Sequence, residues 1–139
     1  MNAKELVTNL FAKWEAGDSS GFFKAVADGV VWTAIGTTPI SGVSHSKQEY
    51  MDKTYLPLQA IFAGSTSCKV KRVVAEGDTV VVEWHGETPL ARGGVYANDY
   101  CWVVRVAGDK FRLALVLRYG SGKAGASCPP HWPKRVARD

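Results

Sequence analysis

Two strand-like segments carry the polar side chains that could take part in proton transfer or oxyanion binding. Within residues 95–106, Asn98 and Tyr100 share one face because side chains alternate along a strand. Within residues 78–87, the imidazole of His85 is the candidate base. A phenol and an amide can donate to an oxyanion, and an imidazole can accept the proton that lies beside a carbonyl. We therefore predict Asn98, Tyr100 and His85 as catalytic residues.

The position of His85 leaves an alternative open. The alternation that places Trp84 inside puts His85 outside with Glu83 and Glu87, where a solvated pair or a dimer contact is the simpler interpretation. A bulge near Gly86 would shift the register and turn His85 inward. The alternative to an enzyme is a protein that keeps the pocket and binds a ligand without a base.

Aromatic side chains gather on the same predicted face. In residues 110–119, the alternation places Leu115 and Tyr119 with Phe111, toward the helices. The predicted substrate-binding residues are Trp14, Trp32, Tyr55, Trp84, Tyr96, Trp102, Leu115 and Tyr119. These rings could simply fill a core, but buried phenol and indole groups each need a hydrogen-bond partner. A wet or ligand-filled cavity supplies such partners, so we predict a pocket for a small apolar molecule.

The elements that position these residues follow from the apolar periodicity. Residues 3–16 have the i, i+3, i+4, i+7 spacing of a helix that ends at Gly17, and a short helical turn follows. Ser46 and Glu49 form a capping box for a third helix, which Pro57 interrupts. Strand patterns cover residues 30–35, 68–75, 78–87, 95–106 and 110–119, with a loop at 36–42. Helices on one side of an antiparallel sheet define an α+β domain.

The charge distribution and the cysteine content indicate which classes of partner to expect. The net charge is +4, but Lys123, Lys134, Arg135 and Arg138 supply much of the positive charge near the end of the chain, so we predict no nucleic-acid partner. The cysteines and histidines lack metal-ligand spacing, which predicts no metal and no cofactor. The first residues lack a signal-peptide pattern, and no apolar run approaches about 18 residues. These features predict a cytoplasmic protein with no membrane partner.

Two segments resemble a known family. Val31-Trp32-Thr33, followed by Gly36 and Pro39-Ile40-Ser41-Gly42, is similar to the strand and Gly-x-x-Pro-x-x-Gly segment of SnoaL-like proteins. Residues 96–105 resemble their Y-x-N-x-Y-x-W-V-x-R strand. The resemblance covers roughly residues 3–119. It implies the nuclear transport factor 2-like fold, in which a cone-shaped, curved mixed sheet, mostly antiparallel, wraps around three N-terminal helices.

The resemblance also implies a range of functions. Relatives include ketosteroid isomerases, polyketide cyclases, limonene-epoxide hydrolases and non-catalytic domains, and many dimerise through the outer sheet face. It thus implies a cofactor-independent isomerase, cyclase or hydrolase for a small apolar carbonyl or epoxide compound, and a homodimer. The family's final strand usually ends in Tyr-x-Asp, whereas this chain has Tyr119-Gly120-Ser121. Serine is no general base unaided, so a non-catalytic binding or dimerisation domain is the alternative. We predict one domain, residues 1–119, and a basic Gly/Pro-rich tail, residues 120–139.

Overall fold

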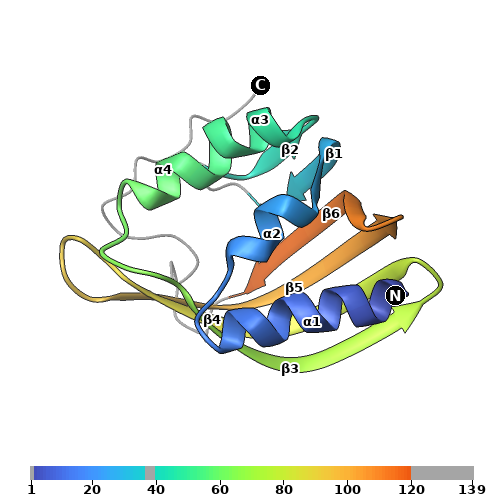
Figure 1. Ribbon diagram of the computed structural model, residues 1–139. Coiled ribbons are helices and arrows are strands. Elements are labelled where there is room, and N and C mark those ends of the chain that lie inside the picture. The colour runs from blue at the N-terminus through green and yellow to red at the C-terminus, as the bar shows by residue number, and fades with distance from the viewer. Residues whose placement is uncertain (1, 37–39, 120–139) are drawn as a thin grey trace.

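Helices precede a run of long strands, as the computed structural model shows for residues 2–36, 40–118 and the backbone of Tyr119. Helices α1 (Ala3–Glu15) and α2 (Ser20–Ala25) lead into strands β1 (Val26–Ala34) and β2 (Gly42–Ser44). A helical segment follows, made of α3 (Lys47–Tyr50), one turn of π-helix (Met51–Tyr55) and α4 (Leu56–Gln59). The remaining strands are β3 (Ser67–Glu76), β4 (Thr79–Pro89), β5 (Val95–Ala107) and β6 (Lys110–Tyr119) (Figure 1). The predicted tail, residues 120–139, lies outside the described residues.

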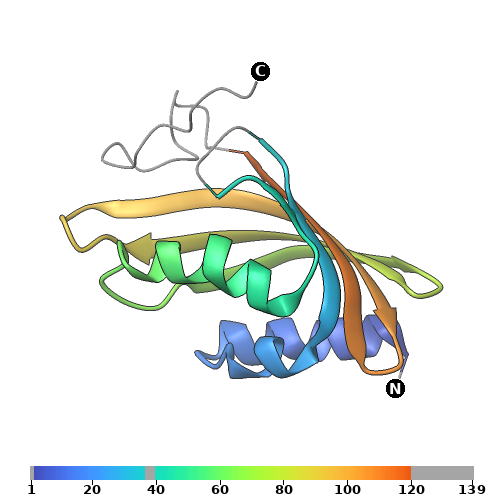
Figure 2. The same ribbon diagram turned by 90° about the horizontal axis from the view of Figure 1, so that it is seen from above.

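The strands of the described residues form one mixed sheet in the order β2-β1-β6-β5-β4-β3. Strands β1 and β6 run parallel, and the other neighbouring pairs in this sheet are antiparallel. The sheet is curved, and the helices lie on one side of it (Figures 1 and 2). The predicted α+β class, with a curved and mostly antiparallel mixed sheet, is therefore confirmed.

Helix α1 begins and ends where its sequence provides caps. The side chain of Asn2 accepts a hydrogen bond from the backbone N–H of Glu5 at 2.8 Å, which satisfies one of the free donors of the first turn. Gly17 follows the helix with a φ of 103°, a conformation that glycine adopts without steric cost. The apolar stripe between these caps is buried through Val7, Leu10 and Phe11. The helix predicted over residues 3–16 is confirmed.

The helical segment after β2 also starts as predicted. The backbone N–H of Glu49 donates to the Ser46 hydroxyl at 3.0 Å, whereas the Glu49 carboxylate accepts from the backbone N–H of His45. Pro57 lies in the first turn of α4. A proline ring cannot donate the i to i−4 hydrogen bond, and the predicted interruption occurs just before it as the π-helical turn.

The last strand differs from its predicted register. Arg105 pairs with Leu113 but the next residue, Val106, pairs with Phe111, so Arg112 is an extra residue in β6. The bulge reverses the faces of every later side chain. Phe111 points inward as predicted, but after the bulge the buried positions are Ala114 and Val116. The predicted inward face of Leu115 is therefore wrong, because one extra residue moves it to the outer face.

The boundaries of two other strands also differ from the predicted ones. Strand β1 starts at Val26, earlier than predicted, because Asp28 and Gly29 form an exposed irregularity where the pairing with β6 shifts. Strand β2 lies within and beyond a segment predicted as a loop. An edge strand of this length is too short to show a period of two.

Candidate functional site

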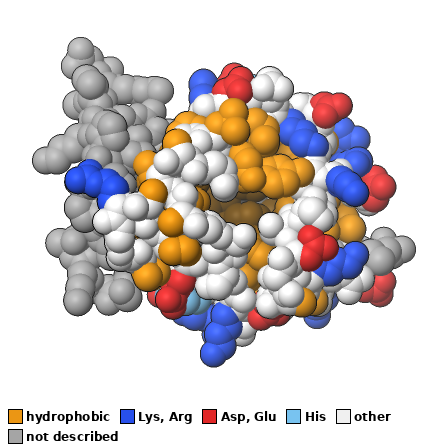
Figure 3. All heavy atoms as spheres, turned by 60° about the vertical axis from the view of Figure 1, so that its left-hand side comes forward, with side chains coloured by type: hydrophobic (Ala, Val, Ile, Leu, Met, Phe, Trp, Pro, Cys, Tyr) orange, Lys and Arg blue, Asp and Glu red, His pale blue; other side chains and the backbone are white. Residues whose placement is uncertain are grey.

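A cavity of about 380 Å³ lies between the inner face of the sheet and the helices. In the space-filling view, hydrophobic side chains line a hollow in the surface (Figure 3). The helices contribute aromatic and hydroxyl side chains, chiefly Trp14, Phe22, Phe23, Tyr50, Thr54 and Tyr55. The sheet contributes Trp32, Ala34, Trp84, Thr88, Tyr96, Tyr100, Trp102, Val116 and Arg118. A concave, mostly apolar lining with a few polar groups is typical of small-molecule sites.

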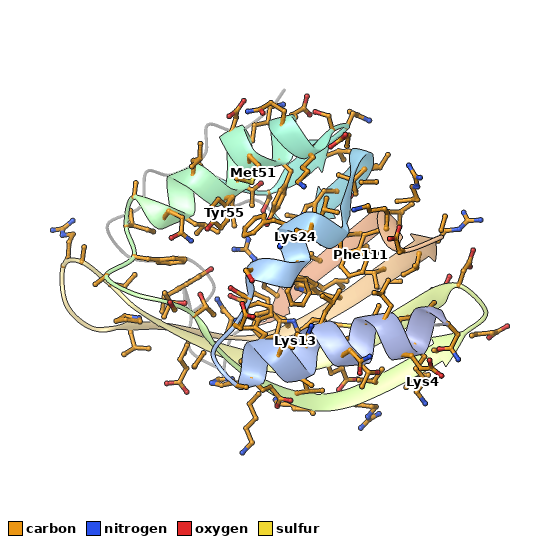
Figure 4. The ribbon with its side chains drawn as sticks, in the orientation of Figure 1. Lys4, Lys13, Lys24, Met51, Tyr55 and Phe111 are labelled. Atoms are coloured by element: carbon orange, nitrogen blue, oxygen red, sulfur yellow. The ribbon has the colours of Figure 1, made fainter. Side chains whose placement is uncertain are left out.

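Phe11 is not part of the lining, but it packs against the rings that are. Its side chain is 1% exposed, and its ring centroid lies 5.7 Å from Trp14, 6.0 Å from Trp84 and 5.6 Å from Trp102. Across the cavity, Tyr55 projects from the π-helical turn (Figure 4), and its ring meets that of Phe23 edge-on at 4.6 Å. Aromatic pairs at these separations hold one another in defined orientations.

Three adjacent strands place one row of polar-tipped side chains on the cavity wall. The register aligns Trp84 of β4 with Tyr100 of β5, and Tyr100 with Arg118 of β6. The rings of Trp84 and Tyr100 stack at 4.2 Å with an interplanar angle of 15°. Arg118 donates from Nη1 to the hydroxyl oxygen of Tyr96 at 3.0 Å. The row thus ends in a guanidinium that hydrogen-bonds a second phenol of the lining.

Two indole groups of the lining keep unsatisfied donors. Nε1 of Trp84 and Nε1 of Trp102 are buried, and neither has a hydrogen-bond partner within the described part of the chain. By contrast, Trp14 donates from Nε1 to the backbone oxygen of Thr66 at 3.0 Å. A buried donor without an acceptor costs about 1–3 kcal/mol of folding free energy. In native proteins such groups are explained by an ordered water, an ion, stored strain or a functional role.

Gly86 makes room for the stacked pair. A Cβ atom at this position would lie 2.6 Å from Cζ3 of Trp84 and 3.1 Å from Cε2 of Tyr100. We expect Gly86→Ala to lower the free energy of unfolding by about 1–3 kcal/mol, because both rings must move in a packed wall. The measurement is urea-induced unfolding. Gly29→Ala is the matched control, because a Cβ there meets nothing within 4 Å. Equal stability of the Gly86 variant and the wild type would contradict the described stacking.

The phenols of the lining are held in their neutral form. Burial raises the pKa of Tyr100, and the nearby Asn98 and Arg118 lower it by smaller amounts. Burial also raises the pKa of Tyr50. Neutral phenols keep their hydrogens and can donate them. The lining residues that the structure describes contain no Asp, Glu or His.

His85 lies on the opposite face of the sheet, where the alternation predicts it. Its Nε2 is 2.9 Å from Oε2 of Glu87, and its Nδ1 is 3.0 Å from Oδ1 of Asp99. The hydrogen bond to Glu87, then that to Asp99, raises the pKa of His85. Hydrogen bonds from Lys71 and His85 lower the pKa of Asp99. The outer face thus carries a charged cluster that favours a protonated imidazole, which cannot accept a further proton.

The structure brings most of the predicted site residues together. Six of the predicted binding residues line the cavity, together with Tyr100: Trp14, Trp32, Tyr55, Trp84, Tyr96 and Trp102. Asn98 is on the same face of β5 as Tyr100 and is 1% exposed, but it is not part of the lining. Leu115 is on the outer face, and the side chain of Tyr119 lies outside the described part of the structure.

Sequence reasoning missed Arg118, Tyr50 and Thr54 as lining residues. An unbroken alternation in the last strand puts Arg118 outside, and its charge favours that interpretation. For Tyr50, the apolar stripe of the third helix was the available signal. In the described residues, no group of three or more His, Cys, Asp or Glu side chains could hold a metal ion. Among the helices the structure describes, none has the length and apolar content to cross a membrane.

Comparisons with known proteins agree with this fold. The pattern of the SnoaL-like domain matches residues 7–114. An NTF2-like protein from Burkholderia thailandensis is similar with a TM-score of 0.71 at 19% identity, over 86% of this chain and 92% of that one. No curated protein matches the chain.

Two further similar structures contain small molecules. TerC, co-crystallized with polyporic acid, has a TM-score of 0.66 at 16% identity, over 83% of this chain and 89% of that one. A hypothetical protein from Catenulispora acidiphila has a ketosteroid isomerase-like fold and is in complex with trimethylamine. Its TM-score is 0.66 at 15% identity, over 93% of this chain and 97% of that one. At these identities the likeness shows the fold alone.

Proposed function

Because this chain belongs to the SnoaL-like family, we propose that it binds a small aromatic molecule in the cavity between its sheet and its helices. The observation that carries the proposal is the concave cavity itself, which is lined by tryptophan and tyrosine rings with a few polar groups among them. The cavity volume of about 380 Å³ also suits a small ligand.

The shape and chemistry of the wall favour a flat ligand. Trp14, Trp32, Trp84 and Trp102 all contribute to it, and the stacked Trp84 and Tyr100 rings offer a planar surface. Aromatic rings pack well against such surfaces and add favourable energy beyond the area they bury. Polyporic acid in TerC and trimethylamine in the Catenulispora protein support the use of this fold for small molecules.

Binding fits the described residues better than catalysis. An isomerase, cyclase or hydrolase acting on a carbonyl or epoxide compound needs a positioned base as well as oxyanion donors. The described lining offers donors such as Tyr100 and Arg118 but no Asp, Glu or His, and the predicted base, His85, is on the other face with two carboxylate partners. We therefore propose that the ligand leaves the cavity unchanged.

A homodimer through the outer sheet face is part of the proposal. Val81, Val103 and Leu115 are aligned across three strands, and Cys101 and Leu117 form the next pair along. This apolar strip has the composition of an interface between two copies of the chain. The bulge in β6 places Leu115 and Leu117 in this strip and turns Ala114 and Val116 to the inner face.

The proposed function is tested by calorimetric titration with 2-naphthamide, a neutral bicyclic aromatic amide. We expect saturable binding at one site per chain, and quenching of tryptophan fluorescence because four tryptophans line the cavity. Mass spectrometry of the released ligand should show it unchanged. Absence of saturable binding to the wild type, for 2-naphthamide and for its acid 2-naphthoate alike, would overturn the proposal. Chemical conversion of the probe would overturn the statement that the ligand leaves unchanged.

A further inference from the structure

The sheet side of the cavity wall carries a row of polar-tipped side chains. The cross-strand row of Trp84, Tyr100 and Arg118 brings an indole, a phenol and a guanidinium side by side. Tyr96 joins them through the hydrogen bond that it accepts from Arg118 at 3.0 Å. The remaining wall combines aromatic and aliphatic side chains with neutral polar ones such as Thr54, Gln59 and Thr66. A ligand in this cavity therefore meets a cationic region beside Arg118 and a neutral, largely aromatic wall elsewhere.

Arg118 gives that region a positive charge. It is the one charged side chain among the lining residues that the structure describes, and its exposure is intermediate. A guanidinium remains protonated at any physiological pH, and its planar fork matches the two oxygens of a carboxylate. In a partly buried site, the attraction between opposite charges is screened less than at the surface.

The neighbouring groups donate hydrogen bonds. An indole N–H and a guanidinium are donors only. Nε1 of Trp84 and Nε1 of Trp102 are both buried without an acceptor in the described structure. The phenol of Tyr100 stays neutral at physiological pH because burial raises its pKa. The guanidinium of Arg118 and the phenol of Tyr100 therefore favour a ligand that supplies acceptors, and an anionic oxygen group supplies several lone pairs as well as the complementary charge.

We infer that the cavity selects a planar aromatic acid, whose carboxylate or equivalent oxyanion pairs with Arg118 while its ring system packs against Trp84 and Trp102. This inference rests on the proposed function and adds the class of ligand. The alternative for Arg118 is a structural one, in which its guanidinium serves only to position Tyr96. The two roles differ in what happens to a neutral ligand of the same shape.

The experiment compares 2-naphthoate with 2-naphthamide, which has nearly the same shape and no charge. Wild-type protein should bind 2-naphthoate at least about tenfold more tightly, as expected for an ion pair in place of a hydrogen bond from a guanidinium to a neutral amide oxygen. Arg118→Met should weaken 2-naphthoate binding by about 10- to 100-fold and 2-naphthamide binding by a clearly smaller factor. Arg118→Lys keeps the charge without the planar fork, and should retain part of the preference for the acid.

Arg112→Met is the matched control, since Arg112 lies on the same strand, is exposed and is absent from the lining. It should bind both probes as the wild type does. Equal wild-type affinity for the two probes, or an equal loss of both in a folded Arg118→Met, overturns the inference and leaves the proposed function standing. If Arg118→Met fails to fold, the inference is tested by the wild-type preference for 2-naphthoate over 2-naphthamide and by the binding of both probes to Arg118→Lys. Failure of both probes to bind the wild type overturns the inference together with the proposed function.

Discussion

Phe11→Ala is expected to lower the free energy of unfolding by about 3–5 kcal/mol, the range for removal of a fully buried phenylalanine side chain. Phe11 is 1% exposed, and its ring packs against Trp14, Phe22, Trp84 and Trp102. Deleting it removes those contacts and leaves a void under the aromatic wall. The measurement is urea-induced unfolding followed by circular dichroism.

Leu56→Ala is the control for that experiment. Leu56 is 52% exposed on the helical segment, so its truncation should change the free energy of unfolding by less than about 1 kcal/mol. A loss below about 1 kcal/mol for Phe11→Ala would contradict the described packing. The cavity wall would then be held by something other than this cluster of rings.

Ala34→Phe is expected to weaken the binding of both naphthyl probes by at least about tenfold, equivalent to about 1.4 kcal/mol. Ala34 is 5% exposed, lines the cavity and pairs in register with Val116 on the neighbouring strand. A phenyl ring added there occupies the space that the ligand requires. Because the ring enters a cavity, the free energy of unfolding should fall by less than the upper end of the about 1–3 kcal/mol typical of overpacking.

Thr33→Phe adds the same ring one residue earlier on the same strand. Thr33 pairs with Val43 and Leu115, so its side chain is on the outer face. This variant should bind both probes as tightly as the wild type. Undiminished binding by folded Ala34→Phe would place the binding site outside the cavity.

The hairpins were predictable because their residues satisfy two requirements at once. Apolar and polar residues alternate over residues 78–87 and over residues 95–106. Glycine with aspartate marks the hairpin turn at one end of each segment. The observed strands Thr79–Pro89 and Val95–Ala107 differ from those ranges by a few residues at their ends. For the same reason, the inward positions of Trp84, Asn98 and Tyr100 could be predicted from parity alone.

The faces of the last strand could not be predicted in the same way. A bulge is one extra residue, and Arg112 has no sequence feature that distinguishes it from a paired residue. Without the bulge, alternation assigns Leu115 to the site and excludes Arg118, which is the residue that gives the described cavity lining its charge. The assumption that charged side chains point outward holds for most positions and fails at sites that recognise an ion.

The parts of the site that come from helices depend on tertiary packing. Thr54 and Tyr55 line the cavity from a turn of π-helix that follows α3 and changes the direction in which its side chains project, whereas Tyr50 lines it from the last residue of α3. A sequence pattern with the regular 3.6-residue period of an α-helix does not indicate such a turn. The distance between the helical segment and the sheet, which sets the cavity volume, is likewise fixed by contacts far apart in sequence.

The central claim is that the cavity holds a planar aromatic acid with its charge at Arg118. The most direct measurement is a crystal structure of the protein with 6-bromo-2-naphthoate, in which anomalous scattering locates the bromine atom. We expect the ring system against Trp84 and Trp102 and the carboxylate within hydrogen-bonding distance of the Arg118 guanidinium. A cavity without ligand density, in crystals where bromine occupies only the outer face of the sheet, would contradict the claim.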